Sequence, residues 1–354
     1  MARPTYTANV IVLRKTKLKE TDLILTCLTE DGSQLRFVAK GARKPNNSFA
    51  SRLELFSNTH VLAVRGRSLD IVKEAKLICG NKGLRESMER MAAASVVCEL
   101  LAKSTQPHLE VKRLYPMVAR ALECMSKCST AQVGADAVAV PDQTNKCSAL
   151  QSETQTGTPA TASHEHANKC STRQANAGAV MVSERTNKCS SLQVMAIVEA
   201  ALLKTFSYLG FQPELRRCIV CGGSLVEAGV AFSYSDGGAV CPRCAPRVNC
   251  VRMSPEVLRR AQFLLYSTFA DVLEDEGENS ECVCGGDSAG NECASERGGF
   301  YGGFYNANAN RASSDCGSAE HLFVSRELLQ FCKTWARAQL GVKLKSMEFL
   351  LSLN

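Results

Sequence analysis

Short runs of apolar and β-branched residues dominate the first 80 positions of the chain. Gly, Asp and Asn residues separate the runs, as at the Asp31-Gly32 turn. Such a pattern predicts short strands, and five of them in succession favour a small β-barrel. The predicted strands are Thr7–Leu13, Leu23–Leu28, Leu35–Ala39, Asn58–Val64 and Leu69–Leu77.

From Gly83 onward the spacing of apolar residues changes to three and four positions, which predicts helices. The predicted helices are Met88–Ser104, Leu109–Met125, Val194–Leu209, Pro255–Leu273 and Ser325–Leu340. The expected fold class is therefore α+β, with an N-terminal barrel at 1–82 and a mainly helical domain built from 83–127, 194–273 and 321–354.

Residues 128–193 interrupt the helical pattern with a sequence rich in Ser, Thr, Ala, Gln and Asn. A short motif recurs there around Cys128, Cys147, Cys170 and Cys189, at spacings of 19, 23 and 19 residues. The copies contain too few large apolar residues to stack as a solenoid. We interpret the segment as a tandem duplication inserted in a loop, because closing a longer loop costs little additional entropy.

Residues 274–320 begin with acidic residues and continue with a Gly-, Asn- and Ser-rich stretch. This composition predicts a second, disordered insertion.

Two Cys-x-x-Cys motifs form the strongest chemical signal in the chain. Cys218 and Cys221 are followed, after nineteen residues, by Cys241 and Cys244. Four thiolates at this spacing are typical of a tetrahedral Zn²⁺ site of the zinc-ribbon type, here embedded at 214–250. Because four thiolates leave no open coordination position, we expect one structural zinc ion rather than a catalytic one.

The remaining cysteines call for other interpretations. Cys98 and Cys124 lie on apolar helix faces and are expected in the core. The irregular group Cys282, Cys284, Cys293 and Cys316, like the cysteines of the repeat, is expected to consist of free thiols.

Positive charge is concentrated at the start of the chain. Residues 1–90 contain 17 Lys and Arg against 9 Asp and Glu, whereas the whole chain has a net charge of +7. A basic excess confined to one domain indicates a polyanionic partner.

Three basic clusters on the predicted barrel point to DNA or RNA. One is at the first turn between strands, one follows the third strand and leads to Phe49 and Phe56, and one is at the turn after Val64. Cations and aromatic rings beside a barrel groove can bind phosphates and stack on bases. The candidate nucleic-acid ligands are Arg14, Lys15, Lys17, Lys40, Arg43, Lys44, Arg52, Arg65 and Arg67.

No catalytic motif accompanies these clusters, so we do not expect an enzyme. The chain lacks a His-Glu-x-x-His motif and a phosphate-binding Gly-x-x-x-x-Gly-Lys-Ser/Thr loop. Glu20, Asp22, Glu30 and Asp31 are the alternative to test, since clustered carboxylates could bind the metal of a nuclease. With no run of 18 apolar residues and no signal peptide, we expect a cytosolic protein without a membrane partner.

Several segments, in order along the chain, resemble the RecO family of recombination mediators. They include Ala8–Arg14 with Lys19–Leu25, Val38–Lys44, Tyr208–Leu215 before Cys218, and Leu340–Ser346. Thr29–Gly32 and Phe349-Leu350 extend the resemblance, which covers roughly 1–127, 194–273 and 321–354.

The resemblance implies that the barrel is an OB-fold and that the protein is bacterial, cytoplasmic and associated with the nucleoid. It also implies binding of single- and double-stranded DNA, annealing of complementary strands, and loading of RecA together with RecR and single-strand DNA-binding protein. Family members often carry an Arg-Phe-Glu run before the position of Gly210, whereas this chain has Ala200-Ala201-Leu202. The main rival interpretation is a zinc-ribbon nucleic-acid adaptor in transcription or RNA metabolism.

Overall fold

The computed structural model describes residues 3–45, 47–128, 175–225, 230–278 and 316–353. The chain divides into two units, Met1–Cys128 with Cys189–Asn354, and Ser129–Lys188. Helix α4 begins in the second unit and ends in the first.

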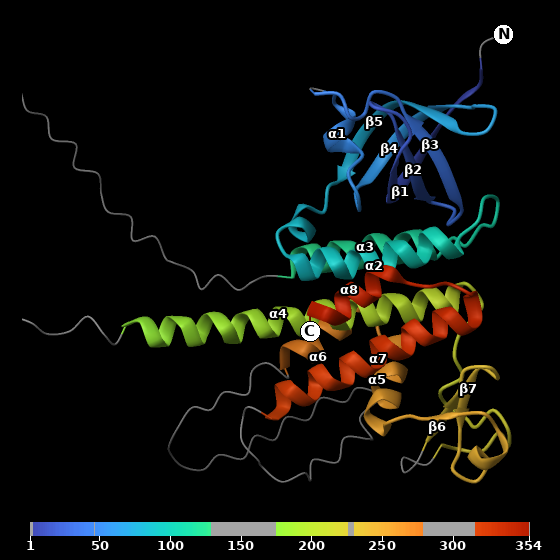
Figure 1. The fold of residues 1–354 in the computed structure, drawn as a ribbon, viewed down its shortest axis with the longest axis vertical. Helices are drawn as coiled ribbons and strands as arrows, with labels where there is room; N and C mark the ends of the chain where they lie inside the picture. The colour runs from blue at the N-terminus through green and yellow to red at the C-terminus, as the bar shows by residue number, and fades with distance from the viewer. Residues whose placement is uncertain (1–2, 46, 129–174, 226–229, 279–315, 354) are drawn as a thin grey trace, which may run out of the picture. The chain divides into compact units, whose positions relative to one another are not determined.

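Five strands near the N-terminus close into a barrel in the order β1-β2-β3-β5-β4. Figure 1 shows this barrel in blue. Neighbouring strands are antiparallel except for β3 and β5, which run parallel. Strand β1 pairs with β4 through its first half and with β2 through its second half, which closes the barrel. The strands are β1 (Thr5–Lys17), β2 (Leu23–Thr29), β3 (Gln34–Ala39), β4 (Asn58–Val64) and β5 (Asp70–Cys79), with helix α1 (Phe49–Arg52) before β4.

The five predicted strands are confirmed, with one consequential difference at β1. The strand continues to Lys17, so Arg14, Lys15 and Lys17 lie on the strand and not in a turn. The register shifts between Val12 and Arg14, which allows the strand to bend and pair on both sides.

The remaining described residues are mainly helical. The helices are η1 (Lys82–Arg85), α2 (Met88–Ser104), α3 (Leu114–Lys127), α4 (Ala175–Tyr208), η2 (Ala245–Arg247), α5 (Pro255–Tyr266), α6 (Phe269–Glu278), α7 (Cys316–Leu340) and α8 (Lys345–Leu353). A small sheet of β6 (Ala231–Ser233), β7 (Gly238–Val240) and β8 (Val251–Arg252) lies between α4 and α5 in the chain. Among the described helices, none has an apolar stretch sufficient to span a bilayer.

Helix boundaries differ from the prediction at α3, which begins at Leu114 and not at Leu109, and at the two insertions. Helix α4 begins at Ala175, inside the predicted 128–193 loop, and α7 begins at Cys316, inside the predicted 274–320 segment. The repeat cysteines 147 and 170, and cysteines 282, 284 and 293, lie outside the described residues.

The predicted helix Pro255–Leu273 is two helices. Helix α5 ends at Tyr266, and Thr268 begins α6 with a reciprocal cap. The Asp271 amide donates to the Thr268 hydroxyl, and Asp271 Oδ2 accepts the Thr268 amide at 2.7 Å. The sequence Thr268-x-x-Asp271 is a capping-box pattern, so the break was detectable from the sequence.

Two apolar cores meet at the wall of the barrel. The barrel interior contains residues such as Leu25, Phe37 and Val61. Ile11, Leu13 and Leu28 point outward and belong to the helical core instead. The side chain of Gln34 adds polar contacts, because its Nε2 donates to the Ala102 carbonyl of α2 at 3.0 Å.

Candidate functional site

The four predicted zinc ligands converge on one point. The Sγ atoms of Cys218, Cys221, Cys241 and Cys244 all lie within 4.8 Å of one another. Three of these residues are buried and Cys221 is exposed. The Sγ atoms of Cys221 and Cys241 are 3.8 Å apart. Bonds of about 2.3 Å from a tetrahedral zinc place sulfurs about 3.8 Å apart, so the donor set fits that geometry.

Backbone hydrogen bonds shape the first motif. The Cys218 amide donates to the Gly223 carbonyl at 2.9 Å, and the Gly222 amide donates to the Cys218 carbonyl at 2.8 Å. Gly222 has a φ of 69°, in the left-handed region that glycine adopts without strain. The tight turn aims both sulfurs of the motif at the same point.

Amide groups also prepare the cluster to hold a cation. Burial raises the pKa of the Cys218 thiol, but hydrogen bonds from the backbone of Cys241, Cys221 and Val220 outweigh it and lower that pKa to about 6. The thiolate is the form that binds metal, so the backbone favours the ligand state.

A cluster of rings attaches the predicted zinc module, residues 214–250, to helix α7. Phe232 of β6 lies edge-on to Phe331 and Trp335 of α7, with ring centroids 4.8 and 5.5 Å away. Trp335 donates its indole N–H to the Phe211 carbonyl at 3.0 Å. The four-thiol cluster is therefore built on a rigid base and stabilises the segment between α4 and α5.

The first two basic clusters of the barrel lie next to each other. The Arg43 amide donates to the Thr21 carbonyl, and the Gly41 amide donates to Asp22 Oδ1 at 2.8 Å. The loop after β3 is therefore fastened to the loop after β1. Lys40 and Lys44 are exposed there, close to the strand that carries Arg14 and Lys17.

The outer face of the barrel carries a row of cations that begins with Arg14. The strand register places Arg14 opposite Thr26, and Thr26 opposite Arg36. These residues point outward because their neighbours Leu25 and Phe37 fill the barrel core. Arg14 and Arg36 are exposed, and Thr26 is buried between them.

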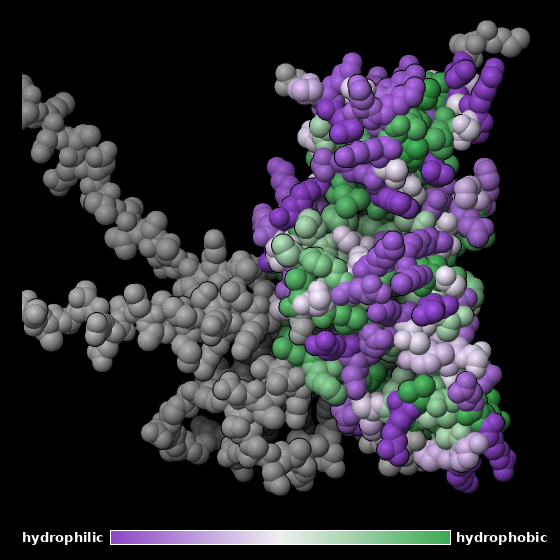
Figure 2. Space-filling view, viewed as in Figure 1, coloured by the Kyte–Doolittle hydropathy of each residue, from purple (hydrophilic) through white to green (hydrophobic). Residues whose placement is uncertain are grey.

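An apolar row adjoins this basic row. Ile24 pairs with Thr16 and Val38, and Val38 pairs with Ile71. Lys40 lies two positions after Val38, just past the end of β3, and Lys73 lies two positions after Ile71 on β5. Both lysines are exposed. We call this surface the outer barrel face: Arg14, Thr16, Ile24, Thr26, Arg36, Val38, Lys40, Ile71 and Lys73. Hydrophilic residues cover most of the visible side of the barrel in Figure 2.

Arg36 and Lys73 were missing from the sequence prediction because neither lies in a run of cations. The alternation of buried and exposed residues along β3 was the available signal, since Leu35 and Phe37 face the core and Arg36 must then face outward.

Several predicted ligands have structural contacts of their own. Arg43 donates from its guanidinium to the Glu20 carbonyl at 2.8 Å, and Arg52 donates to the Ala75 carbonyl at 3.1 Å. Lys15 forms an ion pair with Glu54 at 3.0 Å, and Arg65 lies over the Tyr6 ring. Lys17, Lys44 and Arg67 are exposed. The predicted set is therefore divided between residues that hold the barrel loops together and residues that face solvent.

The two phenylalanines predicted beside the groove are not on the exposed surface. Phe56 is 1% exposed and packs in the helical core, while Phe49 is half-buried against the barrel interior. Neither ring is positioned to stack on a base, which corrects that part of the prediction.

The carboxylates of the alternative nuclease site do not gather. Within the described ranges, the four cysteines are the group of potential metal ligands that converges. Asp22 accepts the Gly41 amide, Asp31 accepts the Ser33 amide, and Glu30 is hydrogen-bonded to Asn9. These acidic residues organise turns and strand edges.

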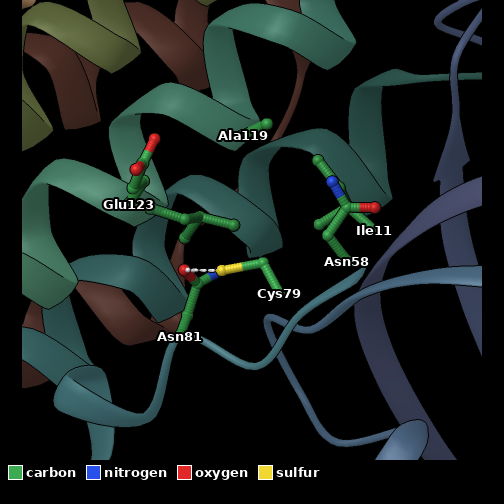
Figure 3. Close-up of a pocket in the computed structure, with 7 residues that line it drawn as sticks. Ile11, Asn58, Cys79, Asn81, Ala119 and Glu123 are labelled. Carbon is green, nitrogen blue, oxygen red and sulfur yellow. Dashed lines mark hydrogen bonds between the residues drawn. The ribbon is translucent and has the colours of Figure 1, made fainter. Parts of the chain in front are cut away.

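A cavity of about 180 Å³ lies between the barrel and helix α3, and Figure 3 shows its lining. The Cys79 thiol donates to Asn81 Oδ1 at 3.2 Å, and Asn58 Oδ1 accepts the Tyr115 hydroxyl at 2.8 Å. Its polar side chains have hydrogen-bond partners within the protein, so we assign it a packing role.

Ala200, Ala201 and Leu202 lie in α4 and are each 0% exposed. This stretch faces the helical core and offers no surface to a partner.

Family models match two parts of this architecture. The family model "Recombination protein O N terminal" matches residues 1–80, and "Recombination protein O C terminal" matches residues 187–276. The first covers the barrel, and the second covers the end of α4, the predicted zinc module, α5 and most of α6.

Curated relatives extend the match. The DNA repair protein RecO of Symbiobacterium thermophilum is 25% identical over 263 residues, which are 73% of this chain and 79% of the relative. The RecO protein of Bifidobacterium adolescentis is 29% identical over 67% of this chain and 73% of its own length. That of Roseiflexus is 27% identical over 68% of this chain and 62% of its own length. The chain, with its N-terminal barrel, helical C-terminal region and four-cysteine cluster, belongs to the RecO family of DNA repair and recombination proteins.

Proposed function

We propose that this protein binds single- and double-stranded DNA on the outer barrel face and anneals complementary strands. Acting with RecR on DNA coated by single-strand DNA-binding protein, it would help to load RecA. Its role in repair follows from the family, whereas these specific steps and partners are our proposal. The observation that carries it is the row Arg14–Thr26–Arg36, which continues through the apolar row to Lys40.

The barrel architecture supports this assignment. Five strands in the order β1-β2-β3-β5-β4 are consistent with an OB-fold, a barrel that binds oligonucleotides on the face of its second and third strands. The outer barrel face includes that region of β2 and β3. We therefore propose the OB-fold as the DNA-binding domain.

Annealing follows from charge neutralisation. Two DNA strands repel each other through their phosphates, and a cationic surface that neutralises phosphates lowers the barrier to their pairing. The apolar side chains of Ile24 and Ile71 beside the arginines offer bases a surface from which water is displaced. In this proposal the protein catalyses no bond-breaking step.

We propose Zn²⁺ as the metal of the four-cysteine cluster. The thiolate set and the 3.8 Å separation of two sulfurs support zinc, and a closed set of four ligands supports a structural role. The ion would supply cross-linking of the zinc module and, with four protein ligands, would itself make no contact with DNA.

A strand-annealing assay tests the proposal. Two complementary fluorescent oligonucleotides are mixed with and without the protein, and then again after coating with single-strand DNA-binding protein. We expect faster annealing in both cases, and no cleavage when magnesium is added. Binding to RNA without annealing of DNA would support the adaptor alternative instead, and cleavage would revive the nuclease.

A further inference from the structure

Exposed aromatic rings mark a second surface, where the zinc module meets α5. Tyr266, the last residue of α5, is 50% exposed, and Phe263 one turn earlier is 37% exposed. The Arg216 guanidinium lies over the Tyr266 ring, 4.0 Å from its centroid. Rings and guanidinium planes exposed together can stack with unpaired bases.

Each cysteine motif carries a further arginine. Arg217 directly precedes Cys218, and Arg243 directly precedes Cys244. Because the sulfurs of those cysteines lie within 4.8 Å of each other, the two arginines are anchored to neighbouring backbone. Arg216, Arg217 and Arg243 are all exposed.

The acidic residue nearest to Arg216 and Arg217 in the chain is hydrogen-bonded to their backbone amides. Glu214 uses one carboxylate oxygen to accept the backbone amides of Arg216 and Arg217, at 2.7 and 3.2 Å. The two guanidinium groups are thus left to face solvent or the Tyr266 ring.

Hydrogen bonds hold the arginine segment against α5. Gln212 Nε2 donates to the Tyr266 hydroxyl at 3.1 Å, and Gln262 Nε2 donates to the Leu215 carbonyl at 2.7 Å. A surface ordered in advance loses less conformational entropy when a flexible ligand binds.

We propose that this α5–zinc surface, formed by Arg216, Arg217, Arg243, Phe263 and Tyr266, binds a second single strand of DNA. The inference rests on the proposed annealing function, which requires two strands on one protein and for which the outer barrel face supplies one site. Arginines bind the phosphates of the second strand, and the two rings stack on its bases. Flat, exposed rings flanked by several cations suit a nucleic acid better than an acidic peptide.

The test uses the full chain and thymidine oligonucleotides of about ten nucleotides, close to the site size of one OB-fold. Native mass spectrometry counts bound strands, and an annealing assay measures rate. We expect two strands on the wild-type protein and one on the Arg216→Ala/Tyr266→Ala variant. The affinity for the second strand should fall at least about tenfold, as the loss of one stacked base predicts, and annealing should be slower. The matched control, Lys345→Ala/Phe349→Ala on α8, removes an exposed cation and an exposed ring and should retain two strands.

The outcomes separate this inference from the function on which it rests. One strand on the wild-type protein, or two strands with normal annealing in the variant, overturns the second surface alone. If the variant binds an acidic peptide ending in Phe more weakly than the wild-type protein does, but still binds two DNA strands, the surface is assigned to a protein partner. That result also overturns the second DNA site. A wild-type protein that binds no strand overturns both proposals. Arg243→Glu, which changes an exposed side chain, replaces the double variant if the latter does not fold.

Discussion

Among single residues, Glu99 makes a connection between helices that no sequence motif reveals. It lies on α2, and its carboxylate accepts the backbone amides of Ser346 and Lys345 at the start of α8, at 2.8 and 3.2 Å. Lys103 forms an ion pair with it at 2.6 Å. Burial raises the pKa of Glu99, but the donors from Lys103, Ser346 and Lys345 outweigh it and lower that pKa to about 2. One helix thus caps another.

The depressed pKa of Glu99 predicts a specific dependence of stability on pH. The folded pKa of about 2 lies below the unfolded value of about 4.3, so the stabilisation is complete above pH 4.3 and declines as the pH falls toward 2. Glu99→Gln should lower the free energy of unfolding by about 1–2 kcal/mol at pH 7 and reduce that decline. Urea unfolding at pH 7 and between pH 4.5 and 2 measures both. The exposed Glu110→Gln variant is the control, and an equal pH profile for the two variants would contradict the assignment.

Replacing Cys221 by serine tests the proposed metal site by changing a single ligand atom. It is the exposed member of the four-cysteine cluster, so replacing its sulfur by oxygen changes coordination with little change in packing. Cys221→Ser should bind less than one zinc per chain after dialysis and unfold several degrees earlier, by roughly 2–4 °C per kcal/mol lost.

Cys250→Ser is the matched control for the metal. Cys250 lies in the same module, but its thiol donates to the Ala245 carbonyl at 3.4 Å and is outside the ligand cluster. This variant should retain one zinc per chain. Full metal content in Cys221→Ser, measured by elemental analysis, would exclude the proposed ligand set.

Between elements, a tight contact joins the β2–β3 turn to the loop between α2 and α3. Gly32 has a φ of 82°, and a Cβ atom built there would lie 2.0 Å from the Val111 carbonyl oxygen. The Asp31-Gly32 turn was predicted from the sequence. The requirement for glycine comes also from a segment that is 79 residues away, which local patterns cannot show.

Two glycine variants separate backbone strain from this contact. Gly210 also has a positive φ, 86°, but nothing lies within 4 Å of the position that an alanine methyl group would take there. Gly210→Ala should therefore cost about 1 kcal/mol for conformation alone, whereas Gly32→Ala should cost at least about 1 kcal/mol more, since the loop must also move. Denaturant unfolding of both variants measures the difference. Equal losses would show that the barrel and the helices are not packed at this turn.

Elements were predicted well where a single period extends over the whole segment. Helix α2 and strand β4 have the predicted bounds, because apolar residues repeat without interruption in each. Strand β1 was predicted too short because its polar end, Arg14–Lys17, has no buried residue at every second position. The break between α5 and α6 was overlooked because apolar residues recur at helical spacing both before and after Thr268.

For the whole molecule, the sequence predicted the composition of the sites better than their arrangement. The spacing of the two Cys-x-x-Cys motifs was enough to predict that their four sulfurs converge. The proposed DNA-binding residues depend instead on strand register, which joins Arg14 to Arg36 across β2. Phe56 shows the same limit, because the apolar residue that follows a basic loop is buried by helices far away in the chain.

The salt dependence of DNA binding by Arg14→Ala/Arg36→Ala tests the central claim most directly. Affinity for a single-stranded oligonucleotide is measured from low to moderate salt for this variant, for the wild-type protein and for the control Lys343→Ala/Lys345→Ala. Each phosphate contact contributes about 0.7 to the slope of log affinity against log salt, so the barrel variant should lose about 1.4 in slope and the control nothing. An unchanged affinity and slope in the barrel variant would contradict the outer barrel face as the DNA-binding surface.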